Sequence, residues 1–533
     1  MEATTEHDIE KGVQVHTAAD NSTDRDGKST IDAENESAQL SGSERGLSYW
    51  SVKLEKIWGV EARGITRVAD NEKTVPRPLH DYFHMFSLWF SINLQAMNII
   101  VGLLGPLVYG LGWVDCICIV IFANALASTS IAYMATYGPE SGNRTQIIGR
   151  YFMGYWPSKI ACCCNVVQQV GFGTIGCIIT GQMITAVNGG SLSLAVGCVI
   201  AAICIGLVAT FGIEYLNKIE RFGYIPQAVV MFVLIGCTGG DFDTHAVSVG
   251  DSGTINANRC SFFALIFASI IGFTAISADF YVYYPKDYPK WMTFASTWTG
   301  IWTSVIFANI VGVGIATGVP NIPAWSDAYD ISSGALLYEC YGSLGGFGGF
   351  CVVVLALGSI TNNAPCSYSA ALTIQVLGRW ANKIPRWFWC ILITAVELVL
   401  SVCGRNKLYT VFENFLPMMA YWICPWITIS LEEYFIFHKL QGKSFDWSIY
   451  NDRTKLPIGY AALLSFLIGF AGAIVGMYQI WYTGPIALMI GGEYGGDIGD
   501  WLGIGFTAIV FPPLRYLELK KFGSHTSKPA FLM

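Results

Sequence analysis

The stretch SITNNAPCSYSA, residues 359–370, places two asparagines, a proline and several hydroxyl groups inside one of the longest apolar runs of the chain. Pro365 has no N–H to donate to the carbonyl of Thr361, so we expect this helix to be kinked or locally unwound. A freed carbonyl inside lipid needs a partner, which a cavity, a water molecule or a bound cation supplies. Asn362 and Asn363 flank the opening, where they either face a cavity or merely satisfy the freed backbone groups.

Composition indicates that lipid surrounds much of the chain. Of the 533 residues, 53% are hydrophobic and only 13% are charged, against roughly 25% charged in soluble domains. The net charge of −7 gathers in the N-terminal region, and no basic patch indicates a nucleic-acid partner. The sixteen cysteines lie mostly in apolar runs without metal-ligand spacing, so we expect neither a metal site nor a cofactor. No nucleophile–base set indicates an enzyme.

Apolar runs, each close to the roughly 20 residues that a bilayer-spanning helix needs, recur along the chain. They predict an all-α polytopic membrane protein with twelve spans, at 84–109, 113–136, 159–187, 191–212, 222–239, 261–283, 291–317, 346–377, 386–403, 408–437, 457–481 and 484–514. The sequence GGEYGGDIGDW interrupts the last run, so that span alternatively begins near Ile498.

The ends of the chain and the loops set the predicted orientation. Residues 1–80 are polar and acid-rich, which is typical of a disordered cytoplasmic tail. They precede a transporter domain at 81–515 and a second cytoplasmic tail at 516–533. With the N-terminus inside, the inner loops and helix edges hold fourteen Lys or Arg residues and the outer loops hold three. This excess is what the positive-inside rule requires, so both termini are predicted to be cytoplasmic.

The first span carries a polar stripe. Ser91, Gln95 and Asn98 share one helical face at about 100° per residue, with Asn93 off that face. The helix-breaking residues that follow are Gly102, Gly105 and Pro106. A polar stripe that leads to a break is typical of a discontinuous transporter helix. Packing between helices through small and amide side chains is the alternative.

The third span presents amides and a ring on one face. Asn165, Gln168 or Gln169, and Phe172 stand at i, i+3 or i+4, and i+7. Amides both donate and accept hydrogen bonds, so they match the amide and amidine edge of a small heterocycle. Phe172 supplies a ring on which such a heterocycle stacks.

Buried acids are the candidate groups for ion coupling. Glu214, Asp279 and Glu397 lie in or at the ends of spans four, six and nine, although an ion pair with neighbouring basic residues is the default interpretation for Glu214. Span six also contains Gly272 followed by Phe273, a second ring for stacking. If spans 1–5 and 6–10 are inverted repeats, interrupted spans one and six occupy matching positions, as do amide-bearing spans three and eight.

These motifs resemble the nucleobase–cation symporter family, and within it the fungal purine–cytosine permease branch. The resemblance covers roughly residues 50 to 520, and it is carried by SLWFSINLQAMNIIVGLLGP, PESGNRTQIIGRYFMGYWPSK, NVVQQVGFG and SITNNAPCSYSA. It implies a 5+5 inverted-repeat core, as in the leucine-transporter fold, plus two further helices. It also implies proton-driven uptake of cytosine, adenine, guanine and hypoxanthine across the plasma membrane by alternating access.

The resemblance places the base between spans one, three, six and eight. Asn165 and Gln168 or Gln169 then form the span-three face, and Asn362, Asn363 and Pro365 shape the span-eight face. Relatives use tryptophans to sandwich the heterocycle, for which Phe172 and Phe273 stand in here. In sodium-coupled relatives, hydroxyls of span eight bind the cation, and Ser359 and Thr361 are the matching groups. Sodium coupling, and another substrate such as uracil, allantoin, a thiamine-like compound or an amino acid, remain alternatives.

Overall fold

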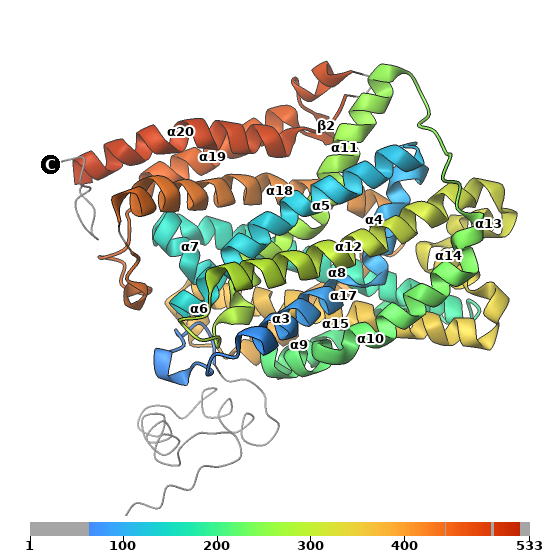
Figure 1. The fold of residues 1–533 in the computed structure, drawn as a ribbon, viewed down its shortest axis with the longest axis horizontal. Helices are drawn as coiled ribbons and strands as arrows, with labels where there is room; N and C mark the ends of the chain where they lie inside the picture. Colours follow the sequence, from blue (N-terminus) through green and yellow to red (C-terminus); the bar gives the residue numbers. More distant parts are fainter. Residues whose placement is uncertain (1–62, 443, 492–494, 523–533) are drawn as a thin grey trace, which may run out of the picture.

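The computed structural model describes residues 63–442, 444–491 and 495–522, apart from the side chains of 213–221 and Gln441. Helices account for almost all of its regular structure (Figure 1). The α-helices are α3 Pro78–Asn93, α4 Ala96–Leu107, α5 Trp113–Ala135, α6 Tyr137–Ser141, α7 Thr145–Met153, α8 Ser158–Val187, α9 Leu194–Phe211, α10 Ile213–Thr238, α11 Ser252–Ile271, α12 Lys290–Gly318, α13 Pro323–Ile331, α14 Ser333–Cys340, α15 Gly346–Leu377, α16 Arg379–Asn382, α17 Arg386–Gly404, α18 Leu408–Glu432, α19 Tyr460–Gly476 and α20 Gly499–Phe522.

Short elements connect these helices. The 3₁₀ segments are η1 Asp70–Glu72, η2 Gly239–Asp241, η3 Gly272–Ala275, η4 Ser277–Tyr281, η5 Val319–Asn321, η6 Gly342–Leu344, η8 Lys439–Gln441, η9 Trp447–Ile449 and η10 Ala487–Ile490, and η7 Glu433–His438 is a π-helix. The strands β1 Tyr478–Gln479 and β2 Tyr482–Thr483 form an antiparallel hairpin. The hairpin occupies the end of the predicted eleventh span, 457–481, and the residues just after it, and α20 begins only at Gly499, as the alternative start near Ile498 anticipates.

Several helices have the length and the lipid-facing surface of membrane spans. Within the described ranges, nine helices are long and apolar enough to cross a membrane, and ten if α3 and α4 count as one bent span. Length and composition therefore do not confirm the predicted twelve: α19 is shorter, at 17 residues, and α18 is not among the nine. Large apolar side chains such as Phe122, Leu207 and Val399 are exposed, which suits a surface in contact with lipid.

The first span is broken, but not where its glycines and proline predict. α3 and α4 meet at a 55° bend around Leu94 and Gln95, whereas α4 continues through the predicted breakers as far as Leu107. Gly102 serves close packing instead, because a Cβ there would lie 2.2 Å from the backbone oxygen of Asn309 on α12. The predicted break at Gly102, Gly105 and Pro106 is therefore wrong in position.

The sixth span is broken at the predicted glycine. α11 ends at Ile271, and the chain continues through η3 and η4 up to Tyr281. A Cβ at Gly272 would lie 2.3 Å from Gln168 Nε2 and 2.8 Å from the Phe172 ring. Only glycine admits the third span so close to the break, which is why the helix gives way here.

The eighth span is a continuous helix, α15, from Gly346 to Leu377. The expectation that Pro365 unwinds it locally is wrong. A proline removes one intrahelical hydrogen bond while its neighbours keep theirs, and the Asn363 side chain adds a donor by giving its Nδ2 hydrogen to the Ser359 carbonyl at 2.6 Å.

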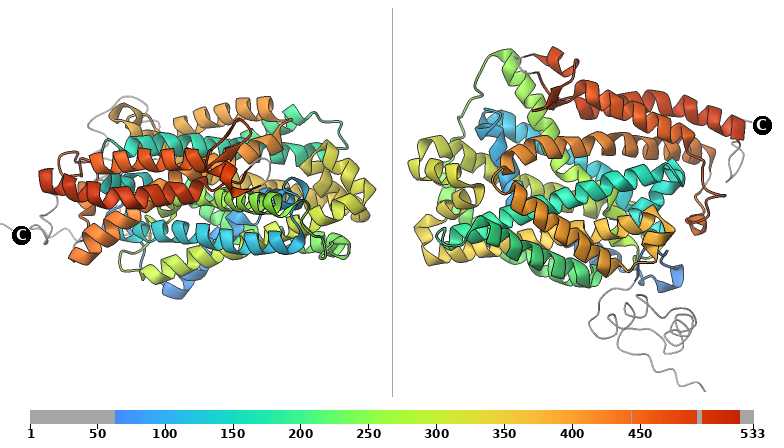
Figure 2. Two further views of the ribbon diagram at one scale, coloured as in Figure 1. Left: turned by 90° about the horizontal axis from the view of Figure 1, so that it is seen from above. Right: turned by 180° about the vertical axis from the view of Figure 1, so that it is seen from behind.

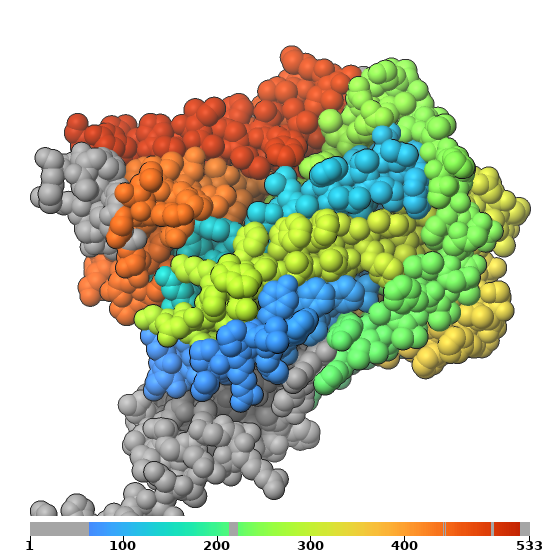
Figure 3. All heavy atoms as spheres, viewed as in Figure 1, coloured from blue at the N-terminus to red at the C-terminus, as the bar shows by residue number. Residues whose placement is uncertain are grey.

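Helix α12 lies along both halves of the broken first span. Figure 3 shows α12 at the surface between α5 and α3. A Cβ at Gly300 would lie 2.8 Å from the carbonyl oxygen of Phe86 on α3, and one at Gly312 would lie 1.9 Å from that of Ile99 on α4. Backbone therefore touches backbone on both sides of the bend.

Residues 63–77 precede α3 and pack against one end of the helix bundle. Val68 N donates to the Gly142 carbonyl at 2.9 Å, and Thr74 N donates to the Tyr283 carbonyl at 3.0 Å. The Lys73 ammonium donates to Asp70 and lowers the pKa of that carboxyl. This part of the predicted tail thus joins the packed domain, whereas residues 1–62 lie outside the described residues. Both ends of the described chain lie at this same end of the bundle (Figure 1).

Helices α19 and α20 lie side by side along one edge of the bundle in both views of Figure 2. A buried ion triad fastens them to α18 and η7. Arg515 of α20 donates to both oxygens of Glu433, at 2.9 and 2.6 Å, and to Glu518 at 2.9 Å. The other oxygen of Glu518 accepts from the backbone N–H groups of Gly459 and Tyr460, which begin α19.

Candidate functional site

Amide side chains gather around the break in the first span. Gln95 Nε2 donates to Asn362 Oδ1 at 2.9 Å, and Asn362 Nδ2 donates to the carbonyl of Ile92. Asn98 Nδ2 donates to the Asn93 carbonyl at 2.6 Å, and Asn93 Nδ2 donates to the Trp89 carbonyl at 3.0 Å. Carbonyls near the break therefore find partners in side-chain amides, which is what allows irregular backbone at membrane depth.

The network extends into two helices that carry no predicted site residue. Asn309 of α12 donates its Nδ2 hydrogen to the Asn98 carbonyl at 2.7 Å, and Asn124 of α5 donates to Asn309 Oδ1 at 2.9 Å. Both side chains are fully buried. The sequence did contain a signal for both residues, because each is a lone amide within an apolar span. Polar residues at such positions usually have a functional or structural role.

The two asparagines of the eighth span play different structural roles. Asn362 reaches across to α3 and Gln95, whereas Asn363 bonds to the Ser359 carbonyl of its own helix. Asn363 also fits against the third span, since a Cβ at Gly176 would lie 1.9 Å from its Nδ2. Asn362 therefore connects to the break, whereas Asn363 bonds within its own helix, at the Ser359 carbonyl rather than at the Thr361 carbonyl that Pro365 frees.

The predicted face of the third span divides into two groups. Asn165 donates to Thr373 Oγ1 of α15 at 2.8 Å, and Gln169 donates to Asn165 Oδ1 at 3.0 Å, so these two amides fasten α8 to α15. Gln168 and Phe172 instead lie at Gly272, the break in the sixth span. Gln168 Oε1 accepts from the Trp422 indole at 2.9 Å.

Of the buried amides with a polar atom that lacks a hydrogen-bond partner, two lie at the breaks. Gln95 Oε1 is an acceptor at the first break, and Gln168 Nε2 is a donor at the second. Their side chains are 3% and 0% exposed. A buried amide atom without a partner costs about 1–3 kcal/mol, so each atom has reason to bind a guest that supplies the missing partner.

Aromatic rings surround both breaks. Trp89 and Phe273 meet edge to face with centroids 5.8 Å apart, which joins α3 to η3. Phe172 meets Phe415 of α18 at 6.2 Å. Phe415, like Trp89 and Trp422, is a ring that the sequence analysis did not single out. Ser91 is also buried, on α3 just before the break.

The candidate coupling groups occupy separate surroundings. Glu397 of α17 is fully buried, both its oxygens accept from the Ser367 hydroxyl at 3.0 Å, and a Cβ at Gly173 would lie 2.2 Å from Glu397 Oε1. Asp279 accepts from the backbone N–H and hydroxyl of Thr145 at the start of α7.

The remaining predicted coupling groups form no common site. The Asp279 carboxylate lies in the field of Arg144, which compensates its charge. Glu214 is on α10, but its side chain lies outside the described residues. The hydroxyls of Ser359 and Thr361 donate to carbonyls of their own helix, Leu355 at 3.3 Å and Gly358 at 3.0 Å.

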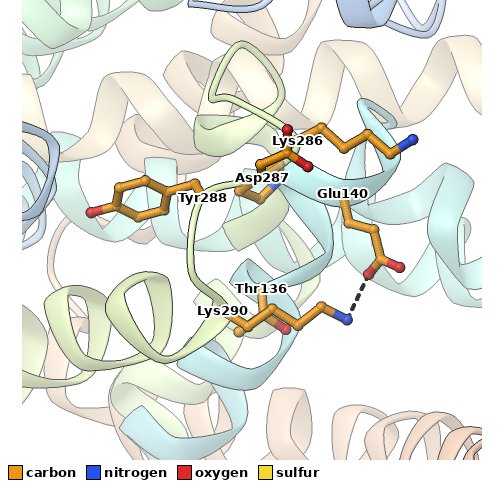
Figure 4. Close-up of a pocket in the computed structure, with 7 residues that line it drawn as sticks. Thr136, Glu140, Lys286, Asp287, Tyr288 and Lys290 are labelled. Carbon is orange, nitrogen blue, oxygen red and sulfur yellow. Dashed lines mark ion pairs between the residues drawn. The ribbon is translucent and has the colours of Figure 1, made fainter. Parts of the chain in front are cut away.

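A cavity of about 290 Å³ lies apart from this site (Figure 4). It is lined by Thr136, Pro139, Glu140, Lys286, Asp287, Tyr288 and Lys290. Lys290 pairs with Glu140 at 2.8 Å, and Lys286 pairs with Asp70 at 3.6 Å. Charged, partly exposed walls suit ions and water better than an uncharged planar ring, so this hollow is not the substrate site that we consider.

Solved structures with a similar fold are transporters. The chain is similar to the nucleobase-cation-symport-1 family transporter MHP1, in a closed conformation with bromovinylhydantoin bound, with a TM-score of 0.66, 14% identity, and coverage of 86% of this chain and 96% of that one. It is also similar to a Na⁺-coupled sialic acid symporter, with a TM-score of 0.58, 12% identity, and coverage of 88% and 95%. These likenesses show the fold.

Sequence comparison shows the family. The chain is 33% identical to the vitamin B6 transporter TPN1 of Saccharomyces cerevisiae, over 89% of this chain and 90% of that protein. It is 34% identical to the purine-cytosine permease fcyB of Emericella nidulans, over 88% and 91%. A family model described as a permease for cytosine/purines, uracil, thiamine and allantoin matches residues 78–502. The chain therefore belongs to this permease family, and it is a multi-pass membrane transporter rather than an enzyme.

Proposed function

We propose that the chain is a proton-coupled symporter that imports cytosine and purines such as adenine, guanine and hypoxanthine across the plasma membrane by alternating access. One observation carries the proposal: Gln95 Oε1 and Gln168 Nε2, an acceptor and a donor, are buried without partners at the breaks in the first and sixth spans. A nucleobase edge offers the complementary donor and acceptor, and Phe172 and Phe273 supply the faces for stacking.

The remaining polar residues support this site in different ways. Asn93, Asn98 and Asn362 hold the break open, and Asn165 and Gln169 fix the third span against the eighth. Ser91 and Pro365 complete the proposed binding faces, and Asn363 shapes the eighth-span face from within its own helix.

The proposed architecture has twelve spans, a 5+5 inverted-repeat core and two further helices. It places both termini in the cytoplasm, with tails at 1–80 and 516–533 around a transporter domain at 81–515. Two observations support this arrangement: the breaks fall in spans one and six, and the described chain begins and ends at the same end of the bundle.

A vitamin of the B6 type is the second candidate substrate. The relative that motivates it is the vitamin B6 transporter TPN1, whose similarity spans as much of the chain as that of the purine–cytosine permeases. A pyridine ring with hydroxyl substituents also offers donors, acceptors and a flat face. Both candidates therefore match the same two glutamines.

Uptake measurements separate these substrates. In fungal cells that lack their own cytosine permease and vitamin B6 transporter, we expect saturable uptake of radiolabelled cytosine, inhibited by unlabelled adenine and abolished by a protonophore. Gln168→Leu, which removes the unpaired donor, is expected to weaken apparent affinity about tenfold, since a hydrogen bond of 1–2 kcal/mol is lost. Uptake of pyridoxine but not of cytosine would show that the second candidate substrate is the correct one. Sodium-dependent uptake would exclude proton coupling.

Glu397 is the acid that we propose carries the proton. Its carboxylate lies between the third and eighth spans, and the described residues provide it with hydroxyl donors but no ion pair. A buried carboxylate without a cation favours protonation, and a group that couples transport must take up and release a proton.

Replacing Glu397 with glutamine fixes an uncharged side chain at this position. We expect Glu397→Gln to lose accumulation of substrate against its gradient while keeping exchange of labelled for unlabelled substrate across the membrane. Asp279→Asn is the matched comparison, because that carboxylate already has partners, and its accumulation should remain sensitive to external pH. Proton-driven accumulation that survives in Glu397→Gln would show that another group carries the proton.

A further inference from the structure

Two aspartates with no role in the proposed transport site lie where α20 begins. Asp497 precedes α20 and Asp500 is in its first turn, in a region where the start of α20 lies close to β1 of the hairpin, to α18 and to the middle of α11 (Figure 1). With Gln479 of β1 and Tyr421 of α18 they form what we call the Asp497–Asp500 cluster. All four side chains are nearly inaccessible, and the two aspartates are 3% and 4% exposed.

The hydrogen bonds of the cluster fix which atoms donate and which accept. The Tyr421 hydroxyl donates its only hydrogen to Asp497. Gln479 must therefore present its nitrogen to the Tyr421 oxygen, at 2.9 Å, which leaves Gln479 Oε1 as an acceptor. Asp497 Oδ1 also accepts from Gly499 N at 2.9 Å, and Asp497 N donates to Ser261 Oγ at 3.1 Å.

Three acceptors in the cluster have no donor. They are Gln479 Oε1 and both carboxylate oxygens of Asp500. Asp497 and Asp500 stand three residues apart at the start of α20, and the charge of each acts on the Tyr421 hydroxyl. Within the described part of the chain, neither carboxylate forms an ion pair with lysine, arginine or histidine.

Among the described residues, the titratable side chains in the field of these two aspartates bring no positive charge. They are Tyr109, Cys260, Tyr421 and Cys424, which are neutral or anionic at every pH. Two buried carboxylates without a counter-charge are strongly unfavourable. The unpaired acceptors add to this cost, and although water could donate to them, only a cation or added protons would also neutralise the charge.

We propose that the Asp497–Asp500 cluster binds a divalent cation, for which Ca²⁺ is the best-suited ion. Two carboxylates neutralise a double positive charge, and Gln479 Oε1 adds a third hard oxygen ligand. The described residues contain no group of three His, Cys, Asp or Glu side chains that could hold a metal ion, so the remaining ligands would be neutral oxygens of backbone, hydroxyl or amide groups, or water. Ca²⁺ accepts such mixed, irregular oxygen sets, whereas Mg²⁺ demands near-ideal octahedral geometry.

Thermal unfolding of the full-length, purified transporter tests the proposal without requiring transport. After EDTA treatment, CaCl₂ added at constant ionic strength is expected to raise the unfolding midpoint saturably, since a ligand that binds only the folded state stabilises it. MgCl₂ should have a smaller effect. Asp500→Asn should abolish the response to Ca²⁺ and, in EDTA, should be at least as stable as the unchanged protein, because it removes an uncompensated charge.

A matched control and a second variant keep the outcome decisive. Asp251→Asn alters an exposed aspartate that caps α11 through Gly253 and Thr254, and it should keep the full response to Ca²⁺. Gln479→Met removes one oxygen at similar volume, so it should need several-fold more Ca²⁺ for half of the response, even if Asp500→Asn does not fold. No response in the unchanged protein, or an equal response in Asp500→Asn, would overturn the proposal. Stabilisation by acid alone would indicate instead that the carboxylates share a proton.

Discussion

Asn362→Ala is expected to abolish concentrative uptake while the protein still reaches the membrane. The substitution removes the acceptor for Gln95 Nε2 and the donor for the Ile92 carbonyl at the same time. Each group left buried without a partner costs about 1–3 kcal/mol. The bend between α3 and α4 would lose its fastening to α15, and Gln95, the proposed substrate ligand, would lose its orientation.

Asn363→Ala is the control for this expectation. Asn363 has the same side chain one residue further along, but it bonds to its own helix at the Ser359 carbonyl. We expect it to lower the amount of folded protein more than the apparent affinity for substrate. Uptake kinetics normalised to the amount at the cell surface distinguish the two effects. If both variants keep the affinity of the unchanged protein, the eighth span does not form the binding site.

Arg515→Gln is expected to have the largest effect on stability. Arg515 is 7% exposed and donates to Glu433 at 2.6 and 2.9 Å and to Glu518 at 2.9 Å, whereas the nearest other described basic group, His438 Nδ1, lies 3.8 Å from the Glu433 carboxylate. Breaking a buried ion pair on one side leaves uncompensated charge and costs about 3–5 kcal/mol. Since Glu518 also holds the start of α19, we expect α19 and α20 to separate from α18 when Arg515 is lost.

The yield of monodisperse protein in detergent, and its unfolding midpoint, measure this effect. Lys520→Gln removes an exposed cation from the same helix and should change neither value. Adding Glu433→Gln to Arg515→Gln should restore part of the loss, because one buried charge disappears with its partner. A purified Arg515→Gln protein as stable as the unchanged chain would show that the triad contributes no net stability.

The positions of the long helices could be predicted from the sequence. The eighth span was predicted at 346–377, and α15 occupies Gly346–Leu377; the third was predicted at 159–187, and α8 occupies Ser158–Val187. Such spans are set by the length of an apolar run and by the turn residues that bound it, both of which are local properties. The short helices α13 and α14 were missed, because they are too brief to give a span signal.

The breaks needed information that the sequence carries only indirectly. At Gly272 the residue type disfavours a helix and the close contact with the third span requires a glycine. Both effects act at the same position, so the break falls at the predicted glycine. At Leu94 and Gln95 no breaker is present, and the helix opens because amides from Asn98 and Asn362 bond to carbonyls beside the bend. Pro365 shows the converse, since a strong local breaker is absorbed into a continuous helix. Which amide faces which carbonyl depends on how distant segments pack.

The same limit applies to the site. Sequence spacing grouped Asn165, Gln168, Gln169 and Phe172 on one face. It could not separate Asn165, which bonds to Thr373, and Gln169, which bonds to Asn165, from the pair beside Gly272. One face of a helix covers a wide arc, so residues on the same face can contact two different neighbouring segments, as they do here. The two buried aspartates at the start of α20 were also not predicted to form a site, because they follow a glycine-rich loop that reads as an interruption of the last apolar run.

The contacts of α12 determine how rigid the broken first span is. Gly300 admits the backbone of α3, and Gly312 admits that of α4, so a single straight helix splints the two segments on either side of the 55° bend. Backbone contact on both sides of the bend opposes flexing of this joint. We therefore expect the break to offer backbone atoms to a guest at a set angle, and opening and closing of the carrier to move other helices relative to α12 and the first span together.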